Sequence, residues 1–140
     1  MLIDSDVDDQ VLSHYKQKRL SELKKGIPIP SITSRQSLLN TITTQRCIIH
    51  FHNPEFARCQ IMDKKLAEAA DIVGDIKFYR AEAQLFEDVC EYLQIRTLPF
   101  LGFFRDGKCV DGIVGFEGLS GDDFKANELV KFIKRSDISK

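Results

Sequence analysis

From residue 34 onward, segments with helical periodicity alternate with short apolar runs, and this alternation restricts the folds open to the chain. Cys47 to Phe51 form a dense apolar run typical of a strand buried on both faces. Apolar residues then recur at three- and four-residue steps from Phe56 to Val73, which predicts a long helix ended by Gly74. The same criteria predict strands at 76–79, 100–104 and 109–114, and helices at 34–42, 82–93 and 124–132.

The last two predicted strands flank Asp106-Gly107, a strong signal for a hairpin turn. The resulting order, α-β-α-β-α-β-β-α, begins with alternation and ends with one hairpin. Such an order implies an α/β fold in which a mixed sheet carries helices on both faces. This arrangement is thioredoxin-like. A length of 140 residues fits one such domain with one appended element.

Residues 1–26 are predicted to form that appended element, with a helix over 5–25. Its first turns are acidic and its last turns basic, which complements the helix dipole, and Gly26 and Pro28 end it. The apolar residues of this helix are sparse, so they either rest on the protein's own domain or contact a partner. Residues 27–33 carry two prolines and are interpreted as a linker or a short edge strand, before a domain at 34–140.

Composition argues against several classes of function. The formal net charge is −1, so the chain lacks the basic character of a nucleic-acid binder and the charge excess of a membrane-surface binder. Its acidic start is unlike a secretory leader. The four cysteines contain no C-x-x-C pair, so neither a disulfide framework nor a zinc site is expected. We therefore expect reduced thiols, a cytoplasmic location, and no metal or other cofactor.

Two segments resemble parts of thioredoxin. Residues 48–51, followed by 56–59, resemble the strand and helix start that carry its C-x-x-C pair. Residues 95–99 resemble the segment that carries its cis-proline. Cis peptide bonds are largely confined to proline, so we expect a cis Leu98–Pro99 bond, the alternative being a trans proline that opens a strand.

The resemblance also shows what has changed. Phe56 stands at the position of the attacking cysteine, and Cys59 at that of the second, buried one. His50 replaces the buried aspartate that relays protons in thioredoxins. Disulfide exchange needs an exposed thiolate of low pKa to attack. Phe56, Cys59 and Pro99 are therefore interpreted as a vestigial site, and no catalytic residue is expected.

A wider resemblance extends over most of the chain. It rests on the basic segment 18–25, on His50-Phe51 with Arg58-Cys59, on Met62 to Leu66, on Val114 to Phe116 and on Asp122 to Phe124. Together these motifs resemble the class III branch of the phosducin-like family. This resemblance implies a co-chaperone that binds the cytosolic chaperonin, the ring complex that folds actin and tubulin, and modulates their folding. The alternatives are a divergent redox protein that uses Cys59, or a general protein-interaction scaffold.

Eight residues are candidates for partner contacts. Phe56 could anchor a peptide beside Leu98-Pro99 or could fold inward to pack. The charged candidates either steer docking or belong to a solvated face. The candidate residues are Tyr15, Arg19, Leu20, Leu23, Phe56, Arg58, Asp122 and Asp123.

His50 and His52 alternate on a predicted strand and so point the same way. Two histidines could begin a metal site, but no third ligand has a convincing spacing. We expect a structural His50 and an exposed His52. Buried cysteines behave as small apolar residues, and Cys59 is expected to be one of them. Core or near-core positions are expected for the remaining cysteines, Cys47, Cys90 and Cys109.

Overall fold

Strand β2 (Cys47–His52) lies at the centre of the sheet, and all of its residues are buried. The computed structural model describes residues 29–140. Its sheet has the order β1-β3-β2-β4-β5. Strands β1 (Ser31–Ile32), β3 (Lys77–Glu82) and β2 run parallel to one another. Strands β4 (Phe100–Arg105) and β5 (Lys108–Val114) are antiparallel, as the hairpin signal predicts. The predicted thioredoxin-like mixed sheet is confirmed.

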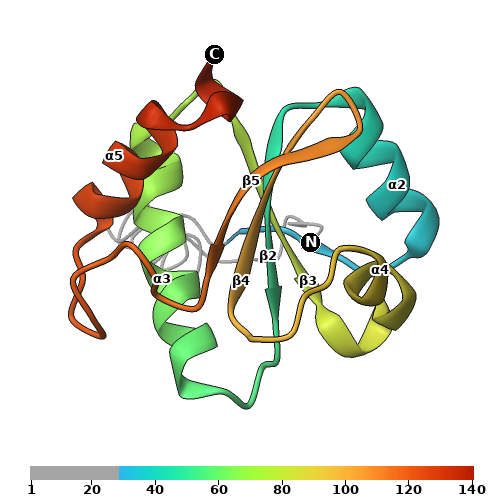
Figure 1. Ribbon diagram of the computed structural model, residues 1–140, viewed down its shortest axis with the longest axis horizontal. Helices are drawn as coiled ribbons and strands as arrows, with labels where there is room; N and C mark the ends of the chain where they lie inside the picture. Colours follow the sequence, from blue (N-terminus) through green and yellow to red (C-terminus); the bar gives the residue numbers. More distant parts are fainter. Residues whose placement is uncertain (1–28) are drawn as a thin grey trace, which may run out of the picture.

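Helices cover both faces of this sheet (Figure 1). One face carries α2 (Arg35–Thr44), the short helix η1 (Ala83–Leu85) and α4 (Glu87–Tyr92). The opposite face carries α3 (Ala57–Ile72) and α5 (Ala126–Arg135), and η2 (Asp137–Ser139) ends the chain. Ser34 caps α2 as predicted, because its Oγ accepts the backbone N–H of Ser37 at 3.1 Å.

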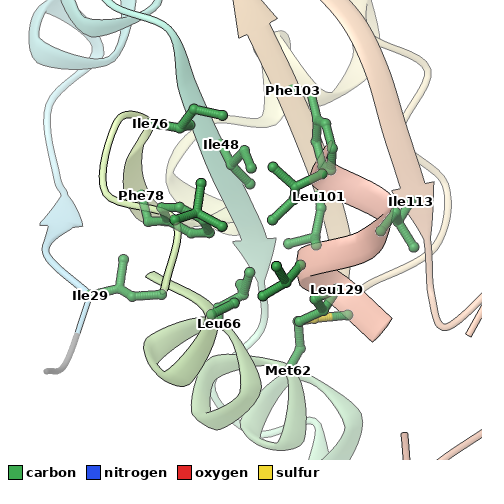
Figure 2. Close-up of a cluster of buried hydrophobic side chains, with 14 of the residues drawn as sticks. Ile29, Ile48, Met62, Leu66, Ile76, Phe78, Leu101, Phe103, Ile113 and Leu129 are labelled. Carbon is green, nitrogen blue, oxygen red and sulfur yellow. The ribbon is translucent and has the colours of Figure 1, made fainter. Parts of the chain in front are cut away.

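The alternation of side chains along β2 divides the core into two clusters. Ile48 packs on the α3 and α5 side with Leu66 and Leu129, and Figure 2 shows this cluster. Ile49 and Phe51 pack on the α2 and α4 side, together with Leu38 and Phe86. Each large apolar side chain buried in this way contributes about 1.5–3 kcal/mol. The vestigial site is therefore held at the end of a rigid strand.

The predicted helix at 82–93 is wrong in its first half. Strand β3 continues to Glu82, a single 3₁₀ turn follows, and α4 begins only at Glu87. The interruption occurs at Phe86, whose backbone is not helical (φ −133°, ψ 46°) and whose side chain is buried. Burial of this ring in the tertiary core outweighs the local helical periodicity.

Residues 31–32 form the short edge strand that was one of the two interpretations of 27–33. Ile29, just before it, is only 9% exposed and belongs to the same cluster as Ile48 and Leu66. The predicted helix over 5–25 lies outside the described residues.

Candidate functional site

The vestigial site lies where β2 ends and β4 begins. The register pairs Phe51 with Phe100, so the residues after β2 and those before β4 lie side by side. The Leu98–Pro99 bond is cis, as predicted. The carbonyl of Pro99 accepts the backbone N–H of Gly115 at 2.8 Å, which brings the loop after β5 to the same end. Three segments that are distant in sequence therefore form one surface.

The start of α3 carries a phenyl ring where disulfide chemistry would need a thiolate. Phe56 occupies the N-cap position and is 46% exposed, so its ring does not fold inward. Cys59, in the first turn, is 1% exposed, and burial raises the pKa of its thiol above the ordinary value. A protonated, buried thiol is a poor nucleophile. This geometry favours contact by Phe56 over disulfide exchange by Cys59.

Arg58 is engaged with the loop after β5. Its guanidinium lies 3.3 Å from the carboxylate of Asp122 and 5.4 Å from the ring centroid of Phe116. Phe116 in turn packs edge-on against Phe124, with 5.0 Å between ring centroids. The structure thus brings Arg58 and Asp122 together, with exposed Asp123 next to them.

The other four candidates, Tyr15, Arg19, Leu20 and Leu23, lie outside the described residues.

A polar network connects β2, through α3 and β3, to edge strand β1. His50 Nδ1 lies 2.7 Å from Asp63 Oδ1, and Arg80 donates to the other carboxylate oxygen of Asp63 at 2.7 Å. Arg80 Nε also donates to Ser31 Oγ at 2.9 Å. Burial acts to raise the pKa of Asp63, but the bond from His50 and the charge of Arg80 lower it below its usual value. The carboxylate is therefore ionised, and His50 Nδ1–H is the donor.

His52 is 4% exposed, so the prediction of an exposed His52 is wrong. The centroids of the His50 and His52 rings lie 5.3 Å apart, which confirms that the two side chains share a face. Burial, followed by the proximity of His50, lowers the pKa of His52 to about 4. His50 Nε2 has no hydrogen-bond partner among residues 29–140. Within that same range, no three potential ligands gather to hold a metal ion.

Two of the other cysteines lie where they were expected. Cys47 is buried, and burial raises the pKa of its thiol to about 12. Cys90 is half-buried and lies near the core.

Cys109 is exposed, so its predicted core position is wrong. It lies on edge strand β5, where a register shift opposite Phe103 and Phe104 breaks the alternation of inward and outward side chains. The thiol turns back to donate to the carbonyl of Asp111.

Sequence reasoning missed the roles of Asp63 and Arg80. One signal was present: Asp63 follows Cys59 by four residues, which places both on the same side of α3. A carboxylate next to buried Cys59 and Met62 requires a polar partner, and His50 supplies it. The register that sets Arg80 opposite His50 depends on tertiary pairing of β2 with β3.

Comparisons with known proteins agree with this geometry. The model of the thioredoxin family matches residues 31–135. Phosducin-like protein 3 of Dictyostelium discoideum is 31% identical, with 94% of this chain and 78% of that protein covered. Thioredoxin domain-containing protein 9 of Homo sapiens is 29% identical, with 94% and 65% covered. Among solved structures, oxidised thioredoxin from Plasmodium falciparum superposes with a TM-score of 0.64 at 17% identity, covering 76% of this chain and 96% of that one.

Among residues 29–140, none of the helices combines the length and the apolar character that crossing a bilayer requires.

Proposed function

Because the chain belongs to the thioredoxin family and, within it, to the phosducin-like proteins, we propose that it is a non-catalytic co-chaperone of the cytosolic chaperonin. In this role it binds the chaperonin ring in the cytoplasm and modulates the folding of actin or tubulin, without a cofactor. The observation that supports the proposal most strongly is the exposed ring of Phe56 at the start of α3, next to a buried Cys59. A thioredoxin frame without its attacking thiol retains a surface for recognition but no nucleophile for exchange.

Two parts of the chain would supply the contacts. The first is the end of the domain, where Phe56 is an exposed aromatic anchor and the Arg58–Asp122 pair lies beside it. Aromatic and arginine side chains supply much of the energy of protein interfaces, so these are the contacts to test first. The second is the N-terminal segment, where we propose Tyr15, Arg19 and Leu20 as contacts.

The test is co-purification of the full chain with the chaperonin, followed by mass spectrometry of the captured proteins. The proposal expects the subunits of the ring to be recovered, with either empty or substrate-loaded rings. Recovery of other cytoskeletal or signalling proteins without the ring would instead identify a general interaction scaffold. Failure to bind both empty and actin- or tubulin-loaded rings would overturn the proposal.

A further inference from the structure

A pocket of about 410 Å³ opens at the sheet edge where the described chain begins. Its walls are the C-terminal end of α3, the start of β3 and the incoming chain itself, with Ile29, Ala70, Val73, Ile76 and Phe78 among the lining residues. Ile72, in the same last turn of α3, is 54% exposed. Figure 2 shows Ile29 and Phe78 close together at the margin of the core cluster, away from Phe103 and Ile113. The pocket is thus a mainly apolar surface at the edge of the core, with the charged side chains of Asp71 and Lys77 also in its lining.

The end of α3 has a negative character. Its last turn contains no basic residue, and exposed Asp71 lies in that turn. Exposed Asp75 follows shortly after but lies 3.7 Å from Arg46, and exposed Lys77 also lines the pocket, so the negative character is greatest at Asp71 and the helix end. The free carbonyl groups at a helix C-terminus carry a partial negative charge, which nearby cations stabilise. A segment with an apolar side chain followed by positive charges would therefore complement both the pocket and the end of α3.

We propose that this occupant is residues 23–28 of the same chain, with Leu23 in the pocket and Lys24 and Lys25 beside the end of α3. Leu23 precedes Ile29 by six residues, so it lies within roughly 20 Å of the pocket even if the chain between them is fully extended. This covalent link gives Leu23 a high effective concentration at the pocket. The docking needs no partner, so it goes beyond the proposed function and is independent of it.

The short connection between Leu23 and Ile29 also argues against docking of Leu23 in a second apolar groove of the domain. That groove lies between α2 and α4, with Leu39, Tyr92 and Phe104 among its lining residues. It is on the opposite face of the sheet from α3 (Figure 1). Ile29 packs on the α3 face, so the described chain begins on that face. Docking at the end of α3 would assign Leu23 to the protein's own domain and leave Val11, Leu12 and Tyr15 available to a partner.

Carbodiimide cross-linking of the full chain at micromolar concentration tests this placement. This reagent joins an amine directly to a carboxylate, so we expect a link from Lys24 or Lys25 to Asp71 or Asp75, found in monomers by mass spectrometry. Leu23→Ser leaves all four cross-linking groups intact and should strongly reduce the yield. Val11→Ser makes the matched apolar-to-polar change farther from the domain and should leave the yield unchanged.

Three results would overturn the proposal. The first is the absence of this link, and the second is a link found only between two copies of the chain. The third is a yield that Leu23→Ser does not change, because the tether alone would then explain the proximity. As a second measurement, backbone amides of residues 23–27 should exchange at least about tenfold faster in Leu23→Ser than in Val11→Ser.

Discussion

His50 Nδ1 lies 2.7 Å from Asp63 Oδ1, at the position where thioredoxins carry a buried aspartate. The resemblance implies that this aspartate serves proton transfer for the neighbouring cysteines. Here the histidine binds a carboxylate of α3, and Arg80 binds the same carboxylate from β3. The pairing connects the central strand to α3 and to the edge of the sheet.

Asp63→Asn should destabilise the fold by about 2–4 kcal/mol, because it leaves buried His50 and half-buried Arg80 without their shared anion. Urea unfolding measures this change as a lower midpoint with an unaltered slope. Asp123→Asn removes an exposed carboxylate and is the control, with an expected change within about 0.5 kcal/mol. Equal effects of the two substitutions would show that the network contributes little to stability.

The stability of the fold should fall as the pH drops from 6.5 towards 4. The pKa of His52 is about 4 in the folded protein and near 6.5 in the unfolded chain, so the unfolded chain binds the additional proton in this interval. A shift of this size lowers the free energy of unfolding by about 3 kcal/mol. This loss is absent well above the pKa of the unfolded chain and complete well below the pKa of the folded protein. His52→Phe should flatten the dependence between pH 6.5 and 4.5. An identical dependence in both proteins would contradict this assignment.

Alkylation of the native protein should modify Cys109 first, because it is the exposed cysteine among the four, and half-buried Cys90 second. Burial raises the pKa of all four thiols, so access of the reagent sets the order, and buried Cys47 and Cys59 should react only when the protein unfolds. Mass spectrometry of timed iodoacetamide reactions gives the order. Modification of Cys59 before Cys109 would be incompatible with the buried thiol.

Gly102→Ala should cost about 1–3 kcal/mol. A Cβ atom at this position in β4 would lie 2.6 Å from the ring of Phe104, which is itself buried and cannot move away. Gly74→Ala is the matched control, because a Cβ atom there would meet nothing within 4 Å. Thermal unfolding of both variants makes the comparison. Equal stability of Gly102→Ala and Gly74→Ala would contradict the close packing of the Phe104 ring against Gly102.

Phe56→Ser should weaken chaperonin binding by about tenfold or more, the usual effect of truncating an aromatic anchor. Leu85→Ser provides the control, because Leu85 is a similarly exposed apolar residue near α4. Titration of the ring complex with each variant measures the two affinities. Equal affinities of the two variants would remove Phe56 from the proposed interface.

The order of elements could be predicted because each has a strong local signal. The structure confirms three of these signals. The apolar run forms β2, the Asp106-Gly107 turn joins β4 to β5, and the three- and four-residue spacing forms α3. Local signals were insufficient where a tertiary contact decides the conformation. Phe86 interrupts a helical pattern to reach the core. Cys109, which pairs with Phe104 next to the register shift in β5, lies exposed in the groove between α2 and α4.

The candidate site was predictable only in its chain positions. The resemblance to thioredoxin segments identified Phe56, Cys59 and Pro99, and it led to the expectation of the cis bond. The partners of His50 come from α3 and β3, so their approach depends on how the sheet and helix pack. The burial of His52 follows from the same packing.

The central claim is that the protein recognises partners and does not exchange disulfides, and a dithiol turnover assay tests it most directly. Purified protein is supplied with insulin disulfides and a reductant, and the rate is compared with that of Cys59→Ser. We expect no turnover above the uncatalysed background for either protein. Sustained turnover by the natural sequence that is lost in Cys59→Ser would contradict the account.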